Sequence, residues 1–77
     1  MNENDFVNMA KNMVIEYERI YNNIKVLTSD IVILLIDFSD DNEMAISLKV
    51  KNIKDNIYNI VFNNKNNTLK SFITNNE

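Results

Sequence analysis

The spacing of apolar residues changes along this chain from a helical period of about 3.6 to a strand period of 2, which favours a mixed fold. From about residue 5 to residue 25, apolar side chains gather on one side of a helical wheel, so this segment is predicted to be an amphipathic helix. Between Met44 and Lys51, apolar and polar residues alternate without interruption, which is typical of a strand with one buried face. The sequence therefore predicts an α+β protein.

Three further segments have the composition of strands, because they are rich in β-branched and aromatic residues and bounded by polar turns. Together with the alternating segment, they predict strands at about residues 31–38, 44–51, 57–62 and 68–74. Short turns between consecutive strands favour a four-stranded antiparallel meander, with the N-terminal helix packed on one face. The chain of 77 residues has room for one core, so residues 1–77 are predicted to form a single small domain.

Residues 40–62 also admit a helical interpretation, which would make the protein an all-α three-helix bundle. Asp40 and Glu43 have the spacing of a capping box at the start of such a helix. This interpretation leaves four large apolar side chains, including Leu48 and Tyr58, facing water. Burial of each of them stabilises a fold by about 1.5–3 kcal/mol, whereas a helix cap contributes about 1 kcal/mol. The meander is therefore the preferred prediction.

Glycine, proline, cysteine, histidine and tryptophan are absent, and their absence excludes whole classes of function. Without Cys or His, the chain cannot form a disulfide framework, a zinc finger or a histidine-based catalytic triad. Without Gly, it has no phosphate-binding loop and no dinucleotide-binding fingerprint. The remaining polar residues show no recognisable catalytic or metal-binding spacing. We therefore expect a non-enzymatic protein without a metal or a cofactor.

The first residues, MNENDF, are acidic and polar, unlike a secretory signal. The longest apolar run, Ile31–Ile36, is far shorter than the roughly 20 residues that span a bilayer. We therefore expect a cytoplasmic protein that does not enter a membrane. Enrichment in Asn and Ile is what AT-rich codons favour, so the gene is expected to lie in an AT-rich genome or mobile element. Together with small size and acidity, this origin favours a viral or mobile-element protein, which would act in the host cytoplasm if it is encoded by a virus.

Charge is distributed unevenly, because residues 1–43 carry a net charge of −6 and residues 44–77 a net charge of +3. An acidic surface can dock on a basic partner or imitate a nucleic-acid backbone. The candidate partner-binding acids are Glu16, Glu18, Asp37, Asp40, Asp41 and Glu43. We expect a protein-binding module, such as an inhibitor that blocks a larger protein or nuclease complex at a basic nucleic-acid-binding groove. Anti-defence proteins of phages and mobile elements, anti-CRISPR proteins among them, act in this way.

Two other functions are compatible with the sequence. Lys49, Lys51 and Lys70 with Phe72 suggest a small RNA- or DNA-binding protein, since basic and aromatic side chains on a sheet hold single strands. Three lysines are few for phosphate binding, so nucleic acid is the less favoured partner. The other alternative is a structural subunit of a larger assembly.

The segment 31–38 is apolar on both faces of the predicted strand, and one helix can cover only one face. Strict alternation places its apolar residues in two rows: Ile31, Ile33 and Leu35 in one, and Val32, Leu34 and Ile36 in the other. An uncovered row would be an apolar patch of the kind found at interfaces. The sequence therefore predicts a homodimer through the sheet or a surface for another protein, while strong sheet curvature that buries both rows is the alternative.

Overall fold

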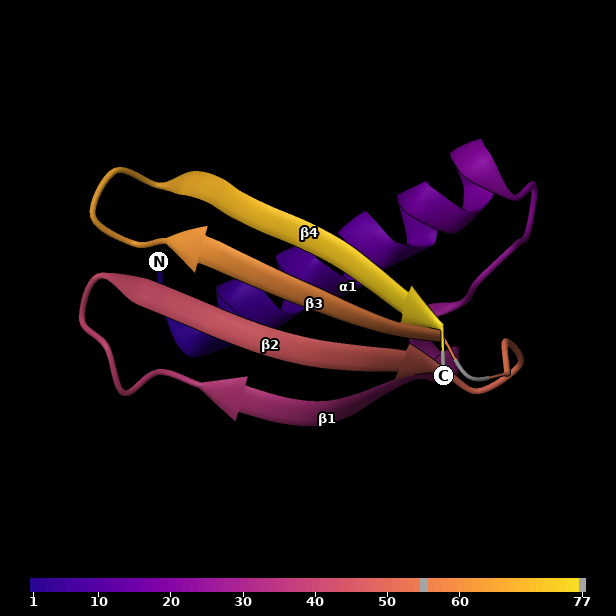
Figure 1. Ribbon diagram of the computed structural model, residues 1–77, viewed down its shortest axis with the longest axis horizontal. Coiled ribbons are helices and arrows are strands. Elements are labelled where there is room, and N and C mark those ends of the chain that lie inside the picture. Colours follow the sequence, from indigo (N-terminus) through magenta and orange to yellow (C-terminus); the bar gives the residue numbers. More distant parts are fainter. Residues whose placement is uncertain (55, 77) are drawn as a thin grey trace.

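The computed structural model describes residues 1–54 and 56–76, which form one long helix and a four-stranded antiparallel sheet (Figure 1). The elements are α1 (Glu3–Tyr21), the short 3-10 helix η1 (Thr28–Asp30), β1 (Ile31–Asp37), β2 (Glu43–Val50), β3 (Asn56–Asn63) and β4 (Thr68–Asn76). The strands lie in the order β1-β2-β3-β4, so each strand pairs with its neighbour in the sequence. This arrangement confirms the predicted α+β class and the meander.

The three-helix interpretation is wrong, because the residues assigned to its second helix form β2 and β3. Met44 pairs with Phe62 across these strands, and Leu48 pairs with Tyr58. All four side chains are buried on the face that packs against α1. The strands thus bury the large apolar groups that a helix would have left in water.

Asparagine residues flank helix α1 at both ends. The side chain of Asn2 accepts a hydrogen bond from the backbone N–H of Asp5 at 2.9 Å, which caps the first turn. The helix ends at Tyr21, earlier than predicted, because Asn23 adopts a left-handed conformation (φ 53°) that asparagine tolerates better than most residues. Among the described residues, no helix is long and apolar enough to cross a membrane.

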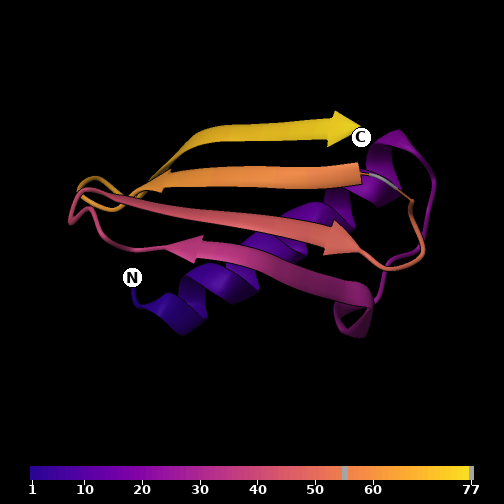
Figure 2. The ribbon, with the colours of Figure 1, turned by 60° about the horizontal axis from the view of Figure 1, so that its bottom comes forward.

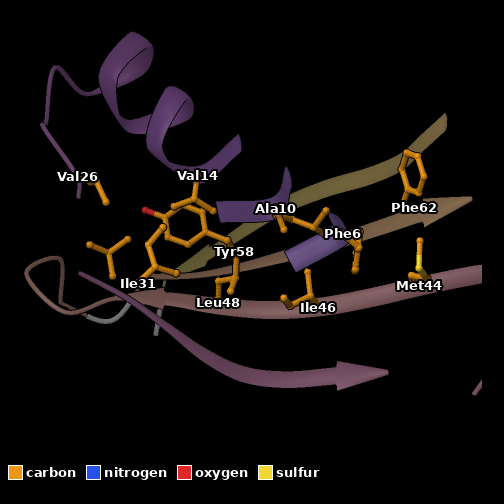
Figure 3. Packing of buried hydrophobic residues seen from close by; sticks show 12 residues of the cluster. Phe6, Ala10, Val14, Val26, Ile31, Met44, Ile46, Leu48, Tyr58 and Phe62 are labelled. Carbon is orange, nitrogen blue, oxygen red and sulfur yellow. The ribbon is translucent and has the colours of Figure 1, made fainter. Parts of the chain in front are cut away.

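The core lies between α1 and one face of the sheet (Figures 2 and 3). Alternate residues of β2 and β3 point to this side, as the period of 2 predicts. Twelve buried apolar residues form the cluster: Phe6, Ala10, Val14, Val26, Ile31, Met44, Ile46, Leu48, Val50, Tyr58, Ile60 and Phe62. Within the described part of the chain, no helix or strand covers the opposite face, which we call the outer face.

A β-bulge in β1 changes which face its residues occupy. Ile33 pairs with Leu48 and Leu35 pairs with Ser47, so Leu34 is an extra residue between two consecutive partners on β2. Past the bulge the alternation is shifted by one residue. The two uniform rows predicted from strict alternation are therefore wrong: the helix-facing residues are Ile31, Ile33 and Ile36, and the outer-face residues are Val32 and Leu35.

We expect the core to depend strongly on Leu48, which is fully buried between β2 and α1. Leu48→Ala leaves a cavity that should cost about 2–5 kcal/mol in the free energy of unfolding, measured by urea denaturation. The matched control is Leu69→Ala, because Leu69 is 47% exposed, and it should cost less than about 1 kcal/mol. Equal losses in the two variants would contradict this placement of the core.

Candidate functional site

Four of the six acids predicted to bind a partner lie in or beside the turn between β1 and β2: Asp37, Asp40, Asp41 and Glu43. Two of them stabilise the turn through hydrogen bonds. The carboxylate of Asp37 accepts hydrogen bonds from the hydroxyl of Ser39 at 2.6 Å and from its backbone N–H at 2.9 Å, and these bonds lower the pKa of Asp37. Asp40 accepts from the backbone N–H of Asn42 at 2.8 Å. These contacts are ordinary turn chemistry.

Two of the predicted acids are paired with basic groups of the same chain. Glu16 accepts from Arg19 one turn later at 2.8 Å, and the hydrogen bond and positive charge of Arg19 lower the pKa of Glu16. Glu43 forms an ion pair with Lys70 that joins β2 to β4, and its hydrogen bond and charge raise the pKa of Lys70. A partner would have to displace these cations, so the two acids contribute less to docking than their charges suggest.

Glu18, one of the predicted partner-binding acids, is buried, with 1% of its surface exposed. Its carboxylate accepts hydrogen bonds from the hydroxyl of Tyr58 and from Nδ2 of Asn22, the latter at 2.9 Å. Burial, then the hydrogen bond to Glu18, raises the pKa of Tyr58. The prediction that Glu18 faces a partner is therefore wrong.

A sequence signal for the burial of Glu18 does exist. Glu18 continues the series Phe6, Ala10 and Val14 at intervals of four residues, and these three are the other buried residues of α1. Its charge conceals this signal, because charged residues are rarely buried unless they find a partner. The partner, Tyr58, comes from the distant strand β3.

The residues of the nucleic-acid hypothesis do not share a surface. Phe72 faces the helix, with its ring centroid 5.3 Å from that of Tyr17. Lys49 lies on the outer face of β2, Lys51 follows the end of β2, and Lys70 is already paired with a carboxylate. The aromatic and basic groups are therefore not arranged as a stacking platform for nucleic-acid bases.

The edge strand β1 exposes four consecutive apolar residues. Val32 and Ile33 are each 36% exposed, Leu34 is 49% exposed and Leu35 is 62% exposed. No strand of the described residues lies beyond β1, and no charged side chain interrupts it before Asp37. An uncharged, exposed edge of this kind is prone to association, because natural edges usually carry charges that prevent it.

A second apolar surface is an open groove of about 400 Å³ between α1 and β4. Its lining residues are Met13, Glu16, Tyr17, Ile20, Tyr21, Leu69 and Phe72. The ring of Tyr17 lies 4.9 Å from that of Tyr21 and 5.3 Å from that of Phe72, which gives the groove an aromatic wall. The helical period of the sequence places the apolar residues of α1 on one side of the helix, but it does not show that those lining this groove lie outside the core.

The chain matches no family model, no curated protein and no solved structure. In residues 1–54 and 56–76, no group of three acidic side chains lies close enough together to hold a metal ion.

We expect Tyr58→Phe to destabilise the protein in a manner that depends on pH. The substitution removes a donor from the buried carboxylate of Glu18 and should cost about 1–3 kcal/mol at pH 7. Since the pKa of Tyr58 is raised, its hydroxyl stays protonated in the folded chain at a pH at which it ionises in the unfolded chain. Its stabilising effect is therefore complete below about pH 10 and is lost as the pH rises further.

Urea denaturation of both proteins at pH 7 and at several pH values around 10 tests this expectation. The difference in unfolding free energy between wild type and Tyr58→Phe should shrink by about 1.4 kcal/mol for each pH unit above 10. A difference that stays constant with pH would show that the hydroxyl of Tyr58 is not protected by the fold.

Proposed function

We propose that this protein is a non-enzymatic protein-binding module that dimerises through β1 and covers a surface of a larger protein. The observation that carries the proposal is the row of exposed apolar side chains on β1, from Val32 to Leu35. Contiguous apolar surface on a small protein marks an interaction site. A chain of this size also gains stability from association, because its own core is small.

A second copy of the chain is a suitable partner for β1. Leu34 is the central residue of this strand, so a two-fold axis near it would bring Leu34 and Leu35 of both copies together. The acids Asp30 and Asp37 lie at the two ends of the apolar segment, away from the two-fold axis. The bulge at Leu34 limits backbone pairing, so we expect packing between side chains to dominate the contact.

Steric blocking of a larger protein is the proposed mode of action, as in anti-defence inhibitors of phages and mobile elements. Small size and two separate apolar surfaces support it. Imitation of a nucleic-acid backbone by the six acids is less favoured, because Glu18 is buried and Glu16 and Glu43 are paired with cations. The larger partner is therefore proposed to contact mainly apolar groups.

We expect Leu35→Lys to convert a dimer into a monomer. Leu35 is 62% exposed, so a lysine there should leave the fold intact while placing two like charges together at the interface. The measurement is absolute mass by light scattering after size exclusion, over a roughly hundredfold concentration range. Wild type should have twice the chain mass of 9.0 kDa, and the variant should have the chain mass.

Ile73→Lys is the matched control, because Ile73 is 52% exposed on the outer face of the opposite edge strand, and it should remain dimeric. A monomeric wild type, or a Leu35→Lys variant that remains dimeric, would contradict the proposal. Growth well beyond a dimer would also contradict it and would instead favour a subunit of a larger assembly.

A further inference from the structure

Helix α1 extends past the edge of the sheet at β4. In Figure 1 its last turns project beyond β4, which is the outermost strand on that side. Ile20 and Tyr21, in the projecting part, are 58% and 71% exposed. A sheet with one more strand beside β4 would cover both side chains. The end of the helix therefore provides a surface on which a further strand can pack, and no strand of the described residues occupies this position.

The edge of β4 has the regular backbone that a further strand requires. Its bulge lies early, where Ser71 pairs with Val61 and Leu69 pairs with Phe62, so that Lys70 is the extra residue. From Ser71 onward, pairing with β3 is regular to the end of the strand. On the side away from β3, the backbone N–H and C=O groups have no partner strand among the described residues. In β1, by contrast, the bulge falls at the middle of the strand.

The groove between α1 and β4 lies on the side of the sheet toward which a further strand would turn half of its side chains. A strand added beside β4 would lie about 4.8 Å from it and would turn every second side chain toward α1. These side chains would meet Tyr17, Ile20, Tyr21 and Leu69, which line the groove. The other side chains would lie beside Ser71 and Ile73 on the outer face, next to water.

We propose that the α1–β4 groove binds an extended segment of the larger partner as a fifth strand of the sheet. The segment carries apolar side chains at alternate positions, which enter the groove, while its backbone pairs with β4. This inference rests on the proposed function as a protein-binding module, and it assigns the larger partner to one site and one mode of binding.

Symmetry favours a segment of another protein over a second copy of this chain, and charge adds only a small preference for a basic segment. Glu16 lies in the wall of the groove, but a Lys or Arg of the bound segment would have to replace Arg19 as its ion-pair partner. Pairing of β1 with β4 would continue from copy to copy without closing, which leads to filaments.

The test uses a phage-displayed library of random peptides about nine residues long, selected on the full-length protein. Selected peptides should carry apolar residues at alternate positions together with Lys or Arg. Ile20→Asp should weaken their binding about tenfold or more, since it places a charge in the groove at a position 58% exposed in the free protein. Binding measured by isothermal titration calorimetry gives this ratio.

Amide hydrogen exchange distinguishes a fifth strand from another mode of binding in the groove. A bound peptide strand should slow the exchange of β4 amides between Ser71 and Thr74, whereas a helical peptide would leave them unchanged. The inference is wrong if no alternating apolar peptide is selected, if Ile20→Asp binds as well as wild type, or if these amides exchange as before.

Leu35→Lys separates this inference from the proposed dimer. The variant should lose the dimer and keep its affinity for the selected peptide, because Leu35 lies on the opposite edge of the sheet. Dimer loss together with peptide loss would overturn the groove as an independent site. Concentration-dependent filaments of the wild type that Ile20→Asp abolishes would show that a second copy occupies the groove, and would overturn the assignment to a partner segment.

Discussion

The packing of a single helix across one face of a four-stranded sheet determines which surfaces of this protein remain open. Phe6, near the start of α1, packs against two aromatic rings that lie 5.9 and 6.1 Å away. At the other end, Glu18 accepts a hydrogen bond from Tyr58 beneath the helix. Because α1 is held at both ends in this diagonal position, its last turn lies beyond β4, and Ile20 and Tyr21 remain exposed (Figure 1).

The face of the sheet on which a strand residue lies could be predicted only where polar residues alternate with apolar ones. Residues 44–51 alternate apolar and polar, so β2 and its buried side were predictable. In β1 no polar residue precedes Asp37, so nothing in the sequence reveals the bulge at Leu34. The interval of four residues that groups Glu18 with the other buried residues of α1 is visible in the sequence, but the hydroxyl that accompanies its burial comes from another strand. The groove depends on where the sheet ends relative to the helix, and no local pattern contains this relation.

The two edges of the sheet differ in ways that favour different partners. β1 presents side chains without charge around a central bulge, which suits a symmetric contact with a second copy. From Ser71 onward, β4 presents a regular backbone beside an aromatic groove, which suits an extended segment of another protein. We therefore propose that self-association uses β1 and leaves the β4 edge available.

Methyl NMR spectra of the leucines, recorded as the protein is diluted, test this claim most directly. Leu35 and Leu69 are both exposed leucines, one on each edge strand, so each reports on its own edge. The account predicts that the resonances of Leu34 and Leu35 shift with concentration while that of Leu69 stays constant. A concentration-dependent shift of Leu69 with constant resonances on β1 would contradict it.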